Sequence, residues 1–356
     1  MSYIRFENLC KNYDQKAVLK NINLEIEKGT LATLLGPSGC GKSTLLRCLA
    51  GLETVTSGKV FLDGKDITDV NPKDRGIGMV FQQYSLFPNM TVEQNIAFGL
   101  KIKKTDKKVI QEKVNDIIGI VGLKEQARQY PSQLSGGQQQ RAALARAIVT
   151  EPKVLLLDEP LSAIDALLRH SLQIEIRRIQ QELGITAIFV THDQDEAMSI
   201  SDFIVVMKAG VVQQIGKPQA VYDDPDNLFV AKFLGTPPIN VFNGSVKGGK
   251  VYIGEEAVLS VNGVNDGEVY VGIRPEGFIL DENGPLGCKL INVEVMGRDV
   301  SVVSSNPASL NPTIRSIINA DAGVDHDAET VRFSVKPHKL FLFDKESEKR
   351  IRFEVK

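Results

Sequence analysis

The sequence is poor in cysteine and histidine, with four of each among its 356 residues. The cysteines are Cys10, Cys40, Cys48 and Cys288. Their spacing matches no paired metal-binding or redox motif, so neither a zinc-binding nor a redox-active site is expected. We expect a reduced, cytosolic protein in which each cysteine fills apolar space.

Strong net charge and long apolar runs are also missing. The chain carries 42 Lys and Arg against 44 Asp and Glu, a formal net charge of −2. This balance gives no support to a protein that binds nucleic acid through bulk positive charge. No apolar run approaches the length of a membrane span, and residues 1–16 are too charged for a signal peptide. Any role at a membrane is therefore expected to depend on a partner.

Residues 1–235 alternate short apolar runs with helical patterns, and the runs include LATLLG, KVLLLDE, TAIFVTHD and DFIVVMKAG. This alternation predicts an α/β domain with a largely parallel, buried sheet. Within that domain, residues 105–123 place apolar side chains at helical spacing. We expect a helical subdomain at about 88–150.

The character of the sequence changes near residues 233–242, where two prolines follow a glycine. Beyond this point lie short β-type runs separated by Gly, Asn and Asp: KVYIG, EVYVGI, CKLINVEVM, VRFSV and KLFLF. This pattern predicts a second, small all-β domain over 236–356, with a barrel-like arrangement. The polar stretch 304–327 fits that pattern less well, because it lacks clear strands.

A glycine-rich stretch follows the apolar run LATLL and precedes a helical pattern. It comprises Gly36, Pro37, Ser38, Gly39, Cys40, Gly41, Lys42, Ser43 and Thr44. The stretch fits G-x-x-x-x-G-K-[ST] in the strand–loop–helix context that this motif requires. Glycines let successive N–H groups face phosphates, while Lys42 reaches the β and γ phosphates and Ser43 ligates Mg²⁺. The sequence therefore predicts ATP and Mg²⁺ as cofactors, the alternative being a plain glycine-rich turn.

Two carboxylates end the apolar run KVLLLDEP. Asp158 is placed to hold Mg²⁺ through water, and Glu159 to polarise the attacking water as a general base. The alternative is a strand end that two acids merely solvate. His192 ends another such run, at the same expected edge of the sheet, and there it could hydrogen-bond the γ phosphate.

Two further side chains are weaker candidates. Tyr13, an isolated aromatic residue ahead of the glycine-rich loop, could stack on adenine. Gln82 leaves a strand and enters a loop, so it could contact the metal ion or the water and move with whatever binds that loop. Taken alone, neither residue predicts a function.

The stretch QLSGGQQQR, at 133–141, places two adjacent glycines in front of a helical pattern. Uncovered N–H groups at a helix start attract an anion. The residues concerned are Ser135, Gly136, Gly137 and Gln138.

In this order, the motifs resemble the ATP-binding subunits of ABC transporters: Walker A at 36–44, Q-loop at Gln82, LSGGQ signature at 134–138, Walker B at 154–159, D-loop at 162–165 and switch His192. The combination of Walker A and LSGGQ is highly specific to this family. The stretches 271–278 and 335–351 resemble the family's C-terminal TOBE region, as in importer ATPases of the maltose-transporter type. The resemblance implies a P-loop NTPase cassette with a helical subdomain, followed by an OB-like TOBE domain.

The resemblance also implies that the signature of one subunit closes on the ATP held by its twin, in a head-to-tail homodimer with Asp165 coupling the two sites. The implied partners are two membrane permease subunits and, indirectly, an extracytoplasmic solute-binding protein. They would place the chain at the cytoplasmic face of the membrane. The loop at 82–88, with Tyr84, Leu86 and Phe87, is the expected docking surface, unless these side chains pack inside the domain. Ile164 stands where the family usually has Leu.

The expected solute is a carbohydrate or a related organic molecule, with a polyamine, ferric iron or a phosphonate-type anion as alternatives. A soluble ABC-type ATPase of translation or DNA repair is a rival from another class. That rival predicts tandem cassettes, sustained heptads or a basic surface, none of which this sequence has. A nucleotide-sensing module without hydrolysis would need a defective site, and a GTPase would need a guanine-reading motif that is absent here.

Overall fold

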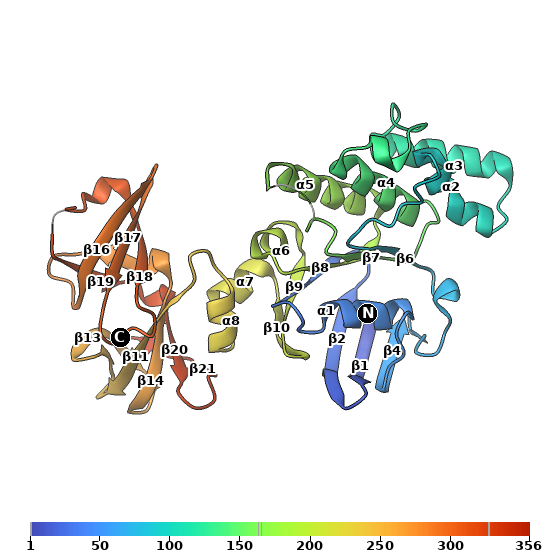
Figure 1. Cartoon of the computed structure of the whole chain (residues 1–356). Coiled ribbons are helices and arrows are strands. Elements are labelled where there is room, and N and C mark those ends of the chain that lie inside the picture. The colour runs from blue at the N-terminus through green and yellow to red at the C-terminus, as the bar shows by residue number, and fades with distance from the viewer. Residues whose placement is uncertain (1, 163, 165, 327) are drawn as a thin grey trace. The chain divides into compact units, whose positions relative to one another are not determined.

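The computed structural model describes residues 2–162, 164, 166–326 and 328–356 (Figure 1). The chain forms two compact units, Met1–Pro218 and Gln219–Lys356. The sequence pattern places the end of the first domain further along the chain, at about residue 235, and that boundary stays a prediction. No helix in the described part of the chain is both long enough and apolar enough to cross a membrane.

A six-stranded sheet forms the centre of the first unit, in the order β10-β9-β3-β8-β7-β6. Its strands are β3 (Leu31–Leu35), β6 (Ile77–Val80), β7 (Val154–Asp158), β8 (Thr186–Thr191), β9 (Phe203–Lys208) and β10 (Val211–Gly216). All neighbours pair in parallel except β9 and β10. Every residue of β3, β7 and β8 is buried, as continuous apolar runs require when both faces of a parallel sheet are covered. The predicted α/β fold is confirmed.

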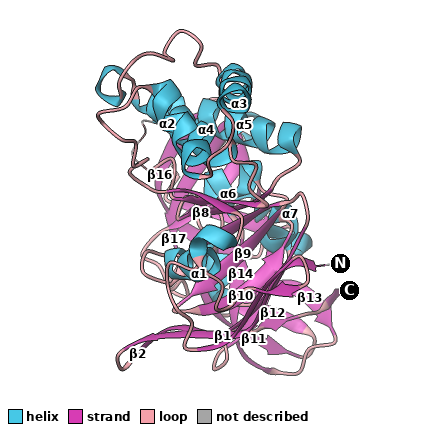
Figure 2. Ribbon diagram, turned by 90° about the vertical axis from the view of Figure 1, so that its right-hand side faces the viewer, coloured by secondary structure: helices cyan, strands magenta, loops and turns pink. Residues whose placement is uncertain are grey.

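Helices cover both faces of this sheet. Figures 1 and 2 show α2 (Val92–Ile102), α3 (Lys107–Ile120), α4 (Gly136–Ile148) and α5 (Ala166–Leu183) on one side and α1 (Lys42–Ala50) on the other. Side chains alternate along β7, so Leu155 and Leu157 join the hydrophobic core with α4 and α5, while Leu156 joins the core with α1. The helical stretch predicted at 105–123 is α3.

A four-stranded antiparallel sheet completes the first unit, in the order β2-β1-β4-β5. Its strands are β1 (Ser2–Tyr13), β2 (Lys16–Glu27), β4 (Ser57–Leu62) and β5 (Lys65–Asp66). Buried residues of β1, such as Ile4 and Phe6, share a core with Leu45 and Leu49 of α1. The helix that follows the glycine-rich loop is therefore held between two sheets. A short helix, α6 (Gln194–Ile200), follows β8.

The second unit is rich in antiparallel strands and contains α8 (Leu228–Phe233), while α7 (Pro218–Asp223) leads into it. The seven-stranded sheet has the order β21-β20-β14-β11-β12-β13-β22, and the five-stranded sheet has the order β15-β19-β16-β17-β18. The strands are β11 (Asn240–Lys247), β12 (Lys250–Ile253), β13 (Glu256–Asn262), β14 (Gly267–Ile273), β15 (Phe278–Leu280), β16 (Leu286–Met296), β17 (Asp299–Ser305), β18 (Ile314–Asn319), β19 (Thr330–Val335), β20 (Leu340–Asp344), β21 (Arg350–Ile351) and β22 (Glu354–Val355). The predicted β-rich C-terminal fold is confirmed, and β18 lies within the polar stretch 304–327, where no clear strand was expected.

Candidate nucleotide site

The glycine-rich loop joins β3 to α1 and depends on glycine at two positions. Gly41 is the N-terminal cap of α1 and has a φ of +103°, in the region that favours glycine. A Cβ atom there would lie 2.8 Å from the Leu19 side chain, and one at Gly36 would collide with the Met207 carbonyl. The backbone of this loop can therefore pass closely between its neighbours only without side chains at these positions.

Lys42 is the first residue of α1 and is 4% exposed. Its Nζ donates hydrogen bonds to the carbonyl oxygens of Gly36, at 2.6 Å, and Pro37, at 3.1 Å. The ammonium group thus lies against the loop, beside a helix N-terminus whose dipole also favours an anion. A positive charge enclosed by a glycine-rich turn suits polyphosphate.

Ser43 and Asp158 meet at the same edge of the sheet. The Ser43 hydroxyl donates a 2.7 Å hydrogen bond to Asp158 Oδ1, at the end of β7. Burial raises the pKa of the Asp158 carboxyl above its usual range, and the hydrogen bond from Ser43 partly opposes this shift. A hydroxyl and a carboxylate side by side are the hard oxygen ligands that Mg²⁺ prefers, so these residues fit the ion.

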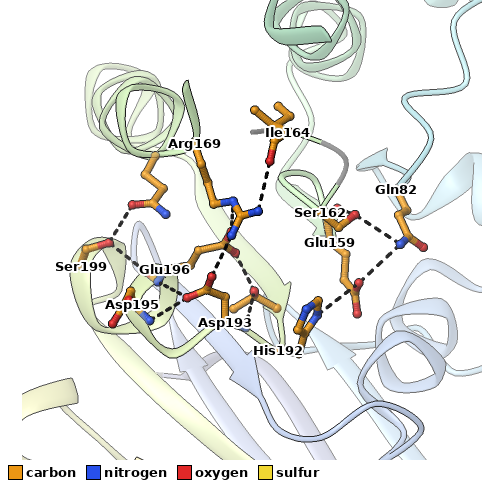
Figure 3. A network of polar contacts seen from close by, with 12 residues as sticks. Gln82, Glu159, Ser162, Ile164, Arg169, His192, Asp193, Asp195, Glu196 and Ser199 are labelled. Atoms are coloured by element: carbon orange, nitrogen blue, oxygen red, sulfur yellow. Dashed lines mark hydrogen bonds and ion pairs between the residues drawn. The ribbon is translucent and has the colours of Figure 1, made fainter. Parts of the chain in front are cut away.

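The three side chains predicted to act on the attacking water converge (Figure 3). Glu159 Oε2 lies 3.5 Å from His192 Nδ1 and 3.5 Å from Gln82 Nε2. Gln82 Nε2 also donates to the Ser162 hydroxyl at 3.2 Å. Glu159 has a φ of +45°, which is unusual for a residue with a side chain, and its N–H donates to the Val190 carbonyl of β8. This conformation turns Glu159 away from the strand that precedes it.

Tyr13 ends β1 and is 40% exposed. Its hydroxyl interacts with the side chains of Glu53 and Thr44, and its pKa is raised by burial first and by Glu53 second. Lys11 Nζ lies 4.7 Å from the ring centroid. The ring is thus both beside the glycine-rich segment and accessible, as a residue that stacks on a base must be.

The signature residues begin α4, on the other side of the six-stranded sheet from α1 (Figures 1 and 2). Ser135 is the N-terminal cap, and its hydroxyl accepts from the Gln138 N–H while its own N–H donates to Gln138 Oε1 at 2.8 Å. Ser135 and Gly136 are exposed, and a Cβ at Gly136 would meet nothing within 4 Å. One chain therefore does not bring its own signature to its own glycine-rich loop. Asp165, predicted to couple two sites, lies outside the described residues.

The expected docking loop is largely turned inward. Tyr84 is only 7% exposed and packs in the core beneath the helices, with Leu86 partly buried against the same core. Phe87 is 37% exposed, and its ring centroid lies 4.5 Å from that of Phe98. The expectation of a three-residue apolar docking surface is wrong for Tyr84, because positive φ angles at Tyr84 and Ser85 turn the loop into the domain.

Sequence reasoning missed a second group of polar side chains beside Gln82, Glu159 and His192. Arg169, Thr191, Asp193 and Glu196 line the same small cavity as Glu159, Ser162 and His192. The run THDQDE contains a signal for the acidic residues of this group, because an acid directly after a strand often caps the helix that follows. Arg169 lies far from this run in the sequence, within α5, and nothing in the local pattern marked it.

Comparison with known proteins gives the family. A model described as ABC transporter matches residues 19–162. The sn-glycerol-3-phosphate import ATP-binding protein UgpC of Ruegeria sp. (strain TM1040) is 40% identical over 99% of both chains. The spermidine/putrescine import ATP-binding protein PotA of Clostridioides difficile (strain 630) is 54% identical over 68% of this chain and 69% of its own.

A solved structure supports the same assignment. The ATP-binding cassette MJ0796, a dimer in a post-hydrolysis state bound to ADP and Pi, is 32% identical with a TM-score of 0.54. The match covers 60% of this chain and 98% of that one. Similarity to import proteins along the full length removes the rival assignment to translation or DNA repair. The chain belongs to the family of importer-type ATP-binding subunits of ABC transporters, and it is an ABC-type ATPase.

Proposed function

We propose that two copies of this chain bind two molecules of ATP between them and use their hydrolysis to drive solute uptake through membrane permease subunits. The proposal rests on one observation: within a single chain, the residues suited to bind phosphate and Mg²⁺ lie apart from the signature residues. Lys42 and Ser43 begin α1, and Ser43 contacts Asp158, whereas Ser135 and Gly136 are exposed at the start of α4, which covers the other face of the sheet (Figure 1). A second copy would supply what each site lacks.

The proposed roles at each site follow from the geometry. Lys42 and the N–H groups of the loop bind the phosphates, Ser43 and Asp158 hold Mg²⁺ with Gln82, and the Tyr13 ring stacks on adenine. When bound, Mg²⁺ neutralises charge that develops on the phosphates. Glu159 accepts a proton from the attacking water, and His192 orients that water and the γ phosphate. The 3.5 Å separation between Glu159 and His192 supports a shared position for the water.

In the dimer, Ser135, Gly136, Gly137 and Gln138 of each copy face the γ phosphate held by the other. Ser135 and Gly136 are exposed at the start of α4, which supports a role in trans. The dimeric state of the cassette MJ0796 is consistent with such a pairing. Asp165, in the segment after Ser162, is proposed to link the two sites.

We also propose the partners of the chain and the class of solute. Two permease subunits would hold the chain at the cytoplasmic face of the membrane, and a solute-binding protein would deliver the cargo. The full-length similarity to a glycerol-3-phosphate import protein supports a carbohydrate or a related organic solute. The 54% identity to a spermidine/putrescine import protein favours a polyamine as the second candidate.

The test is a Glu159→Gln variant, in which the amide keeps the size of the side chain but cannot accept the proton. We expect turnover to fall by about 100-fold or more, while ATP accumulates in a closed dimer that size-exclusion chromatography separates from the monomer. A matched control is Glu182→Gln, in a half-exposed ion pair on α5, which should hydrolyse ATP normally. Unchanged hydrolysis by Glu159→Gln would contradict the proposal.

A further inference from the structure

The small cavity beside Glu159 is also lined by residues that have no part in the reaction proposed above. Arg169, in the first turns of α5, projects toward the segment that carries His192 (Figure 3). Its Nη1 lies 3.0 Å from Asp193 Oδ2, and its Nη2 donates to the Ile164 carbonyl at 3.1 Å. One planar guanidinium therefore joins the segment after Glu159 to the residue directly after His192.

The Asp193 end of this link is itself well fixed. Asp193 caps α6, and its Oδ1 accepts from the N–H groups of Asp195 and Glu196, at 2.9 and 3.2 Å. Its other carboxylate oxygen is the one that pairs with Arg169. One carboxylate therefore serves both the helix cap and the arginine, directly after His192.

A buried carboxylate strengthens the link. Glu196 is 3% exposed, and its Oε2 accepts a 2.6 Å hydrogen bond from the hydroxyl of Thr191, the residue before His192. Its Oε1 lies 3.7 Å from Arg169 Nε, close enough for an ion pair but too far for a hydrogen bond. Burial raises the pKa of Glu196, and the charge of Arg169 opposes that shift. Removing the arginine would leave a buried carboxylate without its cation.

We propose that Arg169 is a positioning residue for hydrolysis: by joining the Ile164 carbonyl to Asp193 and Glu196, it sets the distance between Glu159 and His192. Both ends of the link lie within a few residues of the two side chains that share the water. Arginine suits this task because its rigid fork reaches a carbonyl and a carboxylate at once, which a lysine ammonium cannot do in the same geometry. The inference rests on the roles proposed above for Glu159 and His192.

The test compares Arg169→Ala and Arg169→Lys with Arg178→Ala, a control on the same helix whose ion pairs with Glu175 and Glu182 are partly exposed. We expect Arg169→Ala to lower kcat by about 10- to 100-fold, as a displacement of about 1 Å does at a catalytic centre. The KM for ATP and the binding of a fluorescent ATP analogue should stay within about twofold, since the glycine-rich loop is untouched. Arg169→Lys, which keeps the charge, should recover part of the lost kcat.

An Asp193→Asn variant completes a double-mutant cycle and carries the test even if Arg169→Ala fails to fold. Asparagine retains the acceptor that caps α6 but loses the charge that pairs with Arg169. If the two residues act through one link, kcat of Arg169→Lys combined with Asp193→Asn falls by less than the product of the two single losses. The inference is overturned if Arg169 variants match Arg178→Ala in kcat, or if they lose ATP affinity and thermal stability in proportion to activity.

The same assays separate this inference from the proposed function. If Glu159→Gln loses turnover while Arg169→Ala retains it, only the positioning role of Arg169 fails. If Glu159→Gln retains turnover, the proposed function fails regardless of how Arg169 variants behave.

Discussion

The Ser43 hydroxyl and the Asp158 carboxylate are 2.7 Å apart, although 115 positions separate them in the sequence. The contact joins the first turn of α1 to the last residue of β7. It places a hydroxyl and a buried carboxylate together at the point where two parallel strands end.

Asp158→Asn should raise the stability of the nucleotide-free protein and lower its ATPase activity. Burial raises the pKa of Asp158, so the folded protein holds this proton more tightly than the unfolded chain. The stabilisation from Asp158 is therefore present below its usual pKa and is lost as pH rises through the raised value. At pH 7.5 we expect Asp158→Asn to melt at a higher temperature than the wild type, yet to hydrolyse ATP at least about 100-fold more slowly.

The advantage in melting temperature should shrink as pH falls below the raised pKa of Asp158 in the folded protein, because the buried carboxyl is then neutral, as the asparagine amide is. Asp116→Asn, on the exposed side of α3, is the matched control and should change neither quantity. A lower melting temperature for Asp158→Asn at pH 7.5 would refute the account of this carboxylate.

The cysteines should differ sharply in reactivity. Burial raises the pKa of Cys48 to about 11 and that of Cys288 to about 11, whereas Cys10 is only partly buried. At pH 8 the thiolate fraction of the two buried thiols is about 100-fold below that of a thiol with a pKa of 9. Iodoacetamide followed by peptide mass spectrometry should therefore show Cys10 modified first in the native protein.

The same shifts predict a pH dependence of stability. The unfolded chain releases these two protons near pH 9, whereas the folded protein keeps them to about pH 11, so the free energy of unfolding should decrease between those values. Modification of Cys48 or Cys288 as fast as Cys10 would show that these thiols are not enclosed as described.

The second unit depends on one buried arginine. Arg274 is 0% exposed, donates to the carbonyl oxygens of Ala231, Leu234 and Tyr222, and lies 3.9 Å from the centroid of the Tyr222 ring. Because truncation would leave these carbonyls unpaired, each at a cost of about 1–3 kcal/mol, Arg274→Ala should destabilise the second unit by a few kcal/mol. We expect one calorimetric transition for each unit of the full chain, and the transition of the second unit should move to lower temperature.

Arg298→Ala provides the comparison, since the Arg298 side chain is 93% exposed and should leave both transitions in place. If Arg274→Ala leaves the melting profile as unchanged as Arg298→Ala does, the buried arginine does not hold α8 to β14.

Local patterns were enough to predict where much of the candidate site lies. The runs around β3, β7 and β8 are apolar throughout, so their carboxyl ends, and with them Ser43, Asp158 and His192, could be expected at one edge of a parallel sheet. The glycine-rich turn between β3 and α1 could be predicted from the spacing of its glycines. These features depend on residues that are neighbours in the chain, so one sequence is enough to predict them.

Features that depend on distant contacts could not be predicted in the same way. The apolar character of Tyr84 fits both a docking surface and a core position, and left-handed backbone at Tyr84 and Ser85 accompanies its burial. Arg169 pairs with Asp193, 24 positions away, and Arg274 donates to the carbonyl of Ala231, 43 positions away. A charged residue that satisfies backbone carbonyls leaves no periodic trace in the sequence.

The most direct test of the central claim mixes two inactive variants. Lys42→Ala loses phosphate binding but keeps its signature, whereas Ser135→Arg keeps its glycine-rich loop but blocks its signature. If each site takes one part from each copy, a mixed dimer contains one intact site, and random pairing should restore at most about a quarter of wild-type ATPase activity. A mixture no more active than its separate components, with both variants folded and Ser135→Arg still binding ATP, would contradict the account.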